Sequence, residues 1–476
     1  MTRGHRALVD AVAAALIAVG VFVAFGHSFL NYDSFYSLVW GSDLLAGREP
    51  QYDVSVAPTP HPLAIAVGAV LSPLGDSAED ALLAIVLLSL GAIGVGLFRL
   101  GKELYAWPVG LLAAAIFLTR VPVLNFGIRG YVDLPTIALI VWAAVLEARR
   151  PRSGPPVLAL LALAGLLRPE AWLFAAAYWL WMAPACNWEV RLRLASLAAV
   201  APILWSLSDL LVTGDPLWSL RGTTNLAAEL GRQTGLGAAV EILPLRLGEI
   251  MRLPELIAAV LGLAAGMVWL RRQTLLPAAV AVLNGIAFVV FAIVELPLLG
   301  RYLLLAGAML AVFAAVAALG WLAPGVPEAT RRSWRVAGIL LLAAFAVFTP
   351  AQAARVDDLR DDIAQRDQIQ ADLHDLVRGP EAATALRRCG TLFVPNHRPV
   401  PSLAYWTDSR PRDIVSAQLE RPTSDGLYLA PATSRVERLS ILDPRDPKRL
   451  DAEVPDGYRL SARNRSWLLY AGCRSV

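Results

Sequence analysis

The chain has 476 residues, of which 57% are hydrophobic and only 17% are charged, and its formal net charge is +3. An ordinary soluble domain carries about 25% charged residues, and most of the charges here lie beyond residue 351 or in short runs between long apolar stretches. The composition therefore excludes an ordinary soluble protein. The small net charge, without an extended Lys/Arg face, argues against a nucleic-acid partner.

Eleven apolar segments are predicted to be membrane-spanning helices, because long apolar runs separated by basic runs are typical of such helices. They comprise residues 7–26, 80–99, 106–119, 131–147, 156–167, 171–185, 194–212, 252–270, 275–294, 302–322 and 335–350. The first follows Arg3 and Arg6 and lacks the small-x-small site of a cleaved signal peptide, so we interpret it as a retained helix. A signal peptide is the alternative.

The basic runs predict an orientation, because Lys and Arg accumulate in cytoplasmic loops. With the N-terminus inside, each loop expected in the cytoplasm carries one basic cluster. These clusters are Arg99/Lys102, Arg149/Arg150/Arg152, Arg191/Arg193, Arg271/Arg272 and Arg331/Arg332/Arg335. The odd count then places the tail outside a plasma (inner) membrane. This orientation requires that the short, proline-flanked stretch 62–74 is a juxtamembrane or re-entrant segment that does not cross the membrane.

The first outer loop, residues 27–79, contains the first candidate for chemistry. Apolar residues recur at helical spacing over 34–46, which predicts an amphipathic helix lying in the interface. Asp33 precedes this helix and could simply cap it. Beside Tyr32 and Tyr36, it could also act as a general base toward an acceptor hydroxyl at the water–lipid boundary.

A second acid, Asp133, opens the fourth predicted span two residues before Pro135. An ionisable group at the mouth of an apolar segment is a functional candidate because its burial is costly, although a helix N-cap is the alternative. Asp33 and Asp133 could share a divalent cation such as Mg²⁺ or Mn²⁺. No zinc-ligand spacing, Walker-type loop or Gly-x-Ser-x-Gly motif is present.

Three basic side chains on the predicted outer face could contact a lipid phosphate. Arg168 lies in the turn between two spans and could hold a phosphate bidentately or pair with Glu170 as a structural elbow. Arg301 precedes Tyr302 at the start of the tenth span and could clamp a phosphate or merely snorkel to the interface. His61, between two prolines, is the third.

The tail, residues 351–476, is predicted to be a small extracytoplasmic α/β domain. A polar helical connector (351–378) precedes short apolar runs at 391–394, 426–429 and 466–470 that are typical of strands. Segments 396–399 and 405–408 could face an acceptor glycan, but a structural cap is the favoured interpretation. Cys389 and Cys473 could form a disulfide outside the cytoplasm or stay as thiols.

The order of these features along residues 1–350 resembles that of GT-C glycosyltransferases. The most similar group contains the dolichyl-phosphate-mannose protein mannosyltransferases and the lipid A aminoarabinose transferases. The features that carry the resemblance are Asp33 after the first helix, Pro60-His61-Pro62-Leu63 where the family has Lys, Asp133 opening a span, and Arg301-Tyr302 opening a late one. The chain departs from the family where Ser34-Phe35 replace an acidic pair and His61 replaces the Lys. Arg168 or Arg301 would then carry the phosphate contact.

The resemblance implies a polyprenyl-phosphate sugar donor and an envelope glycan, lipid or protein as acceptor, in a bacterial cell envelope. Asp33 would deprotonate the acceptor hydroxyl, which attacks the anomeric carbon in an inverting displacement, with Asp133 as a second catalytic acid. The rival hypotheses are a non-catalytic carrier or flippase and a scaffold that binds lipid-linked glycans. A transporter would carry charges near span midpoints, where this sequence has few.

Overall fold

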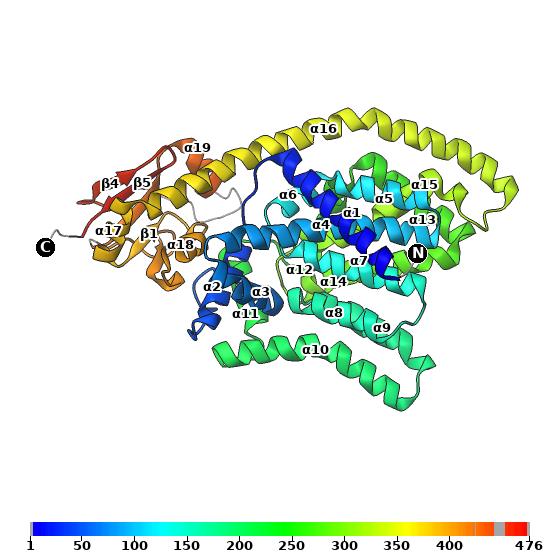
Figure 1. The fold of residues 1–476 in the computed structure, drawn as a ribbon, viewed down its shortest axis with the longest axis horizontal. Coiled ribbons are helices and arrows are strands. Elements are labelled where there is room, and N and C mark those ends of the chain that lie inside the picture. Colours follow the sequence, from blue (N-terminus) through cyan, green and yellow to red (C-terminus); the bar gives the residue numbers. More distant parts are fainter. Residues whose placement is uncertain (1–2, 424, 442–452, 474–476) are drawn as a thin grey trace.

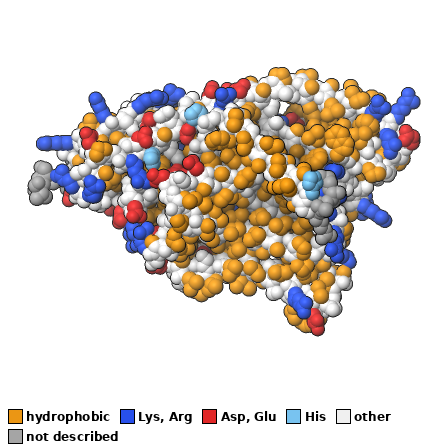
Figure 2. Space-filling view, in the orientation of Figure 1, with side chains coloured by type: hydrophobic (Ala, Val, Ile, Leu, Met, Phe, Trp, Pro, Cys, Tyr) orange, Lys and Arg blue, Asp and Glu red, His pale blue; other side chains and the backbone are white. Residues whose placement is uncertain are grey.

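The computed structural model describes residues 3–423, 425–441 and 453–473. A bundle of helices occupies most of the molecule, and a small sheet domain lies at one end (Figure 1). On the face shown in Figure 2, hydrophobic side chains cover most of the bundle, whereas charged side chains gather toward the two ends of the long axis. The predicted fold class, a polytopic helical membrane protein with a C-terminal α/β domain, is confirmed.

Each of the eleven segments predicted to span the membrane coincides with a helix. These helices are α1 (Arg3–Phe25), α4 (Ser77–Leu104), α5 (Trp107–Leu118), α7 (Asp133–Arg149), α8 (Pro155–Leu167), α9 (Ala171–Met182), α10 (Trp188–Thr213), α13 (Leu253–Trp269), α14 (Arg271–Ile293), α15 (Leu304–Leu319) and α16 (Glu328–Arg378). Within the described ranges, six helices are long and apolar enough to cross a membrane, or eight if each of two bent pairs is one span. The count of eleven crossings and their orientation stay predictions.

The breaks in the two bent pairs lie close together, since Arg120 pairs with Glu255. The axis of α5 turns by 67° into α6 (Val121–Ile128), and the axis of α12 (Gly235–Met251) turns by 104° into α13. Arg120 lies at the first break and Arg252 at the second, where its φ of 61° is in the left-handed region. Each break therefore places a cationic side chain at the end of an apolar helix.

Helix α15 forms the centre of the bundle and packs against α5, α13, α14 and α16. Its alanine-rich sequence is buried on all sides, because small side chains let neighbouring helices approach closely. By contrast, α1, α10 and the first half of α16 expose large apolar side chains such as Leu16, Leu211 and Val347. These exposed faces fit a lipid environment and not water.

The first outer loop forms two short helices, α2 (Tyr32–Leu45) and α3 (Pro62–Leu71). The predicted helix is present as α2, and α3 and α18 (Val400–Thr407) cover it and bury residues on all its faces. Its expected place in the membrane interface stays a prediction. Helices α2 and α3 touch at Gly41 and Gly68, where a Cβ atom would overlap the opposite backbone. Ten residues give α3 a length of about 15 Å, about half of the hydrocarbon thickness, as expected of a helix that does not cross.

The tail begins within α16, which is one continuous helix of 51 residues. The predicted span 335–350 and the connector 351–378 are therefore parts of one helix that is about 76 Å long, and the expected domain boundary at residue 350 falls inside it. Figure 1 shows this helix running along the bundle and into the tail domain. The tail is thus held to the bundle by a helix, without a flexible linker.

Beyond α16, the tail contains a five-stranded mixed sheet in the order β2-β1-β3-β5-β4. The strands are β1 (Leu392–Val394), β2 (Ile414–Ser416), β3 (Leu427–Pro431), β4 (Arg459–Arg463) and β5 (Trp467–Ala471), and the helices are α17 (Pro380–Cys389), α18 and α19 (Ser434–Val436). Strands β2, β1 and β3 are parallel, and β5 pairs antiparallel with β3 and β4. The three predicted strands correspond to β1, β3 and β5.

A disulfide joins Cys389 at the end of α17 to Cys473 after β5, with their Cα atoms 5.5 Å apart. Of the alternatives left open by the sequence, the structure has the pair, while Cys186 is a free thiol. The bond closes a loop across the sheet. Disulfides of this kind form in oxidising compartments, which supports an extracytoplasmic tail.

We expect the disulfide to be present in protein taken from cells. Under denaturing conditions without reductant, a maleimide should label Cys186 alone, and after reduction it should label all three cysteines. Mass spectrometry of the labelled protein counts the adducts, and Cys186→Ser should remove the single adduct that forms before reduction. Three adducts without reduction would mean that the tail cysteines are thiols in the cell.

Candidate active site

A cavity of about 1850 Å³ lies where the helical bundle meets the tail domain. Its walls come from the start of α2, the α8–α9 turn, α11 (Trp218–Glu229), the end of α12, the turn η3 (Gly300–Leu303), α16 and the tail. Seven of the nine predicted site residues line it. They are Tyr32, Asp33, His61, Arg168, Glu170, Arg301 and Tyr302.

Asp33 reaches the cavity because a different residue caps its helix. The Oδ1 atom of Asn31 accepts hydrogen bonds from the backbone N–H of Asp33 (2.9 Å) and Ser34 (3.3 Å), and its Nδ2 donates to the carbonyl of Arg129 at 2.8 Å. The suggestion that Asp33 is the N-cap is therefore wrong. Its carboxylate is free to face other partners from the first turn of α2, where the helix dipole favours an anion.

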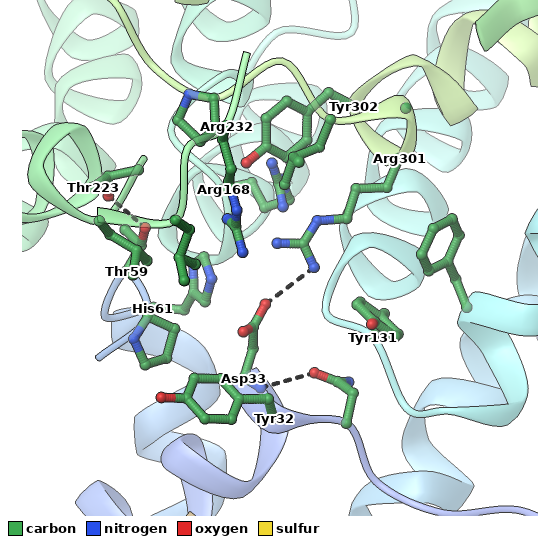
Figure 3. Close-up of a pocket in the computed structure, with 18 of the residues that line it drawn as sticks. Tyr32, Asp33, Thr59, His61, Tyr131, Arg168, Thr223, Arg232, Arg301 and Tyr302 are labelled. Carbon is green, nitrogen blue, oxygen red and sulfur yellow. Dashed lines mark hydrogen bonds and ion pairs between the residues drawn. The ribbon is translucent and has the colours of Figure 1, made fainter. Parts of the chain in front are cut away.

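The carboxylate of Asp33 begins a chain of charged groups (Figure 3). Its Oδ2 lies 3.0 Å from Nη1 of Arg301, and the same nitrogen lies 3.9 Å from Oδ2 of Asp133. Nη1 of Arg168 contacts Oδ1 of Asp133 at 3.0 Å, and its Nε pairs with Glu170. Two arginines are thus held between three carboxylates.

Asp133 belongs to this series of charged groups but lies behind the cavity wall. It is 2% exposed and is absent from the cavity lining. Although it begins α7, its side chain makes no capping bond, so the N-cap interpretation is wrong here as well. Its carboxylate instead fixes the guanidinium groups of Arg168 and Arg301. Asp133 therefore contacts both arginines but does not itself line the cavity.

Aromatic rings orient the two arginines. The guanidinium of Arg168 lies 4.4 Å from the ring centre of Tyr302, and that of Arg301 lies 5.2 Å from the ring centre of Tyr131. Cation–π contacts of this length favour a cation over the ring face. Asn284 secures the backbone of this turn, since its Nδ2 donates to the carbonyl of Tyr302 at 2.9 Å. Both arginines are therefore preorganised.

His61, the N-cap residue of α3, adds little charge to the site. Burial, reinforced by the nearby guanidinium of Arg168, lowers the pKa of His61 to about 3. The imidazole is therefore neutral at pH 7. It can exchange a hydrogen bond with a ligand, but the positive charge that the predicted phosphate contact needs must come from the arginines.

Asp33 itself is ionised at neutral pH. Burial alone raises the pKa of Asp33, but the surrounding cations, above all Arg301, outweigh burial and hold its pKa below the usual value. Arg232, in the segment before α12, contributes to this lowering and also lines the cavity. Figure 3 shows Arg168, Arg232 and Arg301 converging on the space beside Asp33.

The two tyrosines predicted on the acceptor side behave differently. Tyr32 lines the cavity, donates from its hydroxyl to the carbonyl of Val56 (3.0 Å), and has its ring centre 5.4 Å from that of His397 in the tail. Tyr36 is fully buried beneath it, with its ring centre 4.7 Å from that of Trp40. Tyr36 therefore supports the helix and does not reach the cavity.

The two tail segments predicted to face an acceptor also differ. His397, Arg398 and Pro399 line the cavity. In the other segment, the Tyr405 hydroxyl donates to the carbonyl of Gly75 at 2.7 Å, and this contact docks α18 onto the bundle. The first segment thus reaches the site, whereas the second has the structural role that the sequence favoured.

The residues do not fit the shared divalent cation considered from the sequence. Arg301 lies between Asp33 and Asp133 and contacts both, so its positive charge occupies the place that a cation would take. Among the described residues, no group of three His, Cys, Asp or Glu side chains has metal-binding geometry. The side chains themselves are therefore the groups available for chemistry at this site.

Comparison with known proteins shows similarity at the level of structure. No family model and no curated protein sequence matches the chain. One match is the crystal structure of ArnT from Cupriavidus metallidurans bound to undecaprenyl phosphate. The alignment covers 100% of this chain and 99% of the ArnT chain, at 13% identity and a TM-score of 0.59. The chain has the fold of ArnT. The apo form of ArnT gives the same result at 14% identity, 99% and 98% coverage and a TM-score of 0.51.

The likeness to ArnT confirms the GT-C fold expected from residues 1–350 and extends it. Because the alignment covers the whole chain, the tail domain belongs to the ArnT-like fold and is no unrelated addition. At 13% identity, this likeness shows the fold alone.

Proposed function

We propose that the chain is a membrane glycosyltransferase that moves a sugar from a polyprenyl-phosphate donor to a hydroxyl group of an extracytoplasmic acceptor. The observation that carries the proposal is the contact of one carboxylate, Asp33, with Arg301 in a large cavity that Arg168 also lines. A base for the acceptor and cations for the donor phosphate thus share one space. The undecaprenyl phosphate bound to ArnT, which has the same fold, supports this choice of donor.

The donor phosphate is assigned to Arg168 and Arg301. A guanidinium group binds phosphate through two parallel N–H bonds, and the Nε atom of Arg301 is buried without a hydrogen-bond partner in the described structure. An unpaired buried donor is costly unless a ligand satisfies it. The polyprenyl tail would lie in lipid beside the apolar cavity wall, which includes Phe291 and Val294.

Asp33 is assigned as the general base. In the proposed step, the acceptor hydroxyl gives its proton to Asp33 while its oxygen forms a bond to the anomeric carbon. The bond from that carbon to the phosphate oxygen breaks, and polyprenyl phosphate leaves with the electron pair. Attack from the face opposite the leaving group inverts the anomeric configuration. Cations at the leaving phosphate stabilise the charge that develops on it.

The contact between Arg301 and Asp33 links donor binding to base strength. While Arg301 pairs with Asp33, it lowers the pKa of the carboxylate and makes it a weak base. A bound phosphate competes for the same guanidinium, which frees Asp33 and raises its pKa toward the range useful for proton transfer. The base is therefore strengthened when the donor is present.

We expect Asp33→Asn to abolish most sugar transfer while donor affinity is unchanged or higher, because the anion that competes with the phosphate for Arg301 is removed. Loss of a general base lowers the rate by about 10²–10⁴-fold, because the amide cannot accept the proton. Transfer from a polyprenyl-phosphate sugar is measured as product formed per minute, and donor affinity is measured separately by titration. Asp53→Asn is the matched control, since Asp53 lies in the same loop with a side chain that is 63% exposed. Full activity in Asp33→Asn would exclude this base.

A protein that binds the donor but gives no product, in wild type and variants alike, would support the carrier or scaffold instead. Retention of donor affinity in the double variant Arg168→Gln/Arg301→Gln would contradict the phosphate assignment. These two readouts separate the enzyme from its rivals, because only the enzyme both binds through the arginines and turns over through Asp33.

The pH dependence should follow the lowered pKa of Asp33. The base form exists above this pKa, so kcat/KM should stay constant from neutral pH down past the usual carboxyl range and fall only as Asp33 is protonated. In Arg232→Gln, one cation that lowers this pKa is lost, and the acid limb should move to higher pH. A pH–rate profile of both proteins tests this, and an acid limb that is unchanged or moves downward contradicts it.

A further inference from the structure

A second cavity, of about 390 Å³, lies outside the site described above, where the α12–α13 break meets α16. Its walls combine apolar side chains with Arg252, Glu255, Gln352 and Arg355. Neither the proposed transfer reaction nor the donor phosphate involves these residues. The charged groups at this place, so close to exposed apolar helices, therefore need a separate explanation.

Positive charge dominates this second cavity. Arg120, at the α5–α6 break, pairs with Glu255 at 2.8 Å, and both side chains are at least nine-tenths buried. The charges of Arg252 and Arg355 act on Arg120 from nearby. Three guanidinium groups therefore face one carboxylate, which leaves an excess of two positive charges around the cavity.

The partners of these groups within the described residues do not remove that excess. Arg355 donates to the side-chain oxygen of Gln352 at 3.3 Å, and Gln352 in turn donates to the carbonyl of Thr119 at 2.7 Å. These contacts fix positions but add no negative charge. Glu255 is 7% exposed, and neither its Oε2 nor the donor Nε of Arg120 has a hydrogen-bond partner in the described structure. The polar side chains of this wall are therefore held in place, but some of their hydrogen-bonding atoms have no partner.

Apolar surface adjoins the charged wall. Leu253 and Phe348, which line the cavity, have 68% and 48% of their surface exposed, and α13 and α16 continue from them as apolar helices. A ligand that satisfies both parts carries an anionic head and a hydrocarbon chain. The predicted topology puts this place at the outer end of its helices, at headgroup depth, where a lipid phosphate would lie.

We propose that this cavity binds the phosphate headgroup of an anionic membrane phospholipid, with its acyl chains along α13 and α16. Arg252 and Arg355 contact the phosphate, because guanidinium groups match its geometry and charge. Arg120 stays paired with Glu255 and holds the wall in place. The end of α12 separates the two cavities, since Arg246 and Glu249 line the first and Gly248 and Arg252 line the second.

The test is lipid binding by the full chain in detergent, measured by native mass spectrometry with phosphatidylglycerol as the anionic probe and phosphatidylcholine as its zwitterionic counterpart. We expect wild type to retain phosphatidylglycerol preferentially. Arg355→Gln should weaken its binding by about tenfold or more, the size expected for a lost charge-assisted hydrogen bond. Arg360→Gln is the matched control, because Arg360 is an exposed arginine on the same helix.

Equal retention of the two lipids, or equal weakening by Arg355→Gln and Arg360→Gln, would overturn the proposal. Inorganic phosphate that raises the melting temperature as much as phosphatidylglycerol does would overturn the assignment to a lipid. Arg252→Gln gives a second variant with the same expected loss, so the test does not depend on one substitution folding well. None of these readouts requires sugar transfer, and the result is therefore independent of the function proposed above.

Discussion

The site depends on one constraint, which is that charges buried beside a membrane must neutralise each other. Removing an ion from water costs several kcal/mol in a protein interior, and Arg168 and Arg301 are almost enclosed. Asp133 and Glu170 compensate for this cost from the protein side, while Asp33 meets Arg301 from the cavity side. Both arginines also line the cavity. In the proposed exchange an incoming phosphate replaces Asp33 as the partner of Arg301, so that the arginine keeps an anionic partner while Asp33 is released.

The fold brings these charged side chains together from distant parts of the sequence. Asp33 and Arg301 are 268 residues apart. The glycine contact of α2 with α3 holds one end of this pair, and the hydrogen bond from Asn284 to Tyr302 in the η3 turn holds the other. The long helix α16 carries the tail over the opening, so that His397 faces Tyr32. The bundle supplies the cations and the proposed base, and the tail covers the space in which we propose that an acceptor lies.

Much of this arrangement was predictable because patterns of hydropathy and charge depend on residues that are close together in the sequence. The apolar runs predicted the helices, and the crowding of ionisable residues at their outer ends predicted that Asp33, Arg168 and Arg301 share a face. Contacts that depend on three-dimensional packing were not predictable: Asn31 has the capping role that was one alternative for Asp33, and Tyr36 is buried. Arg232 gave no signal, because its polar segment resembles any loop. The continuity of α16 was missed because hydropathy changes abruptly near Pro350 while the backbone does not.

The most direct test of the central claim is a structure of the protein determined by electron cryo-microscopy with a polyprenyl phosphate bound. We predict phosphate oxygens within hydrogen-bonding distance of Arg168 and Arg301, and an Asp33 carboxylate separated from Arg301 and facing open space beside Tyr32. A phosphate bound elsewhere, with the 3.0 Å contact between Asp33 and Arg301 intact, would show that this ion pair is structural and that the proposed exchange of partners does not occur.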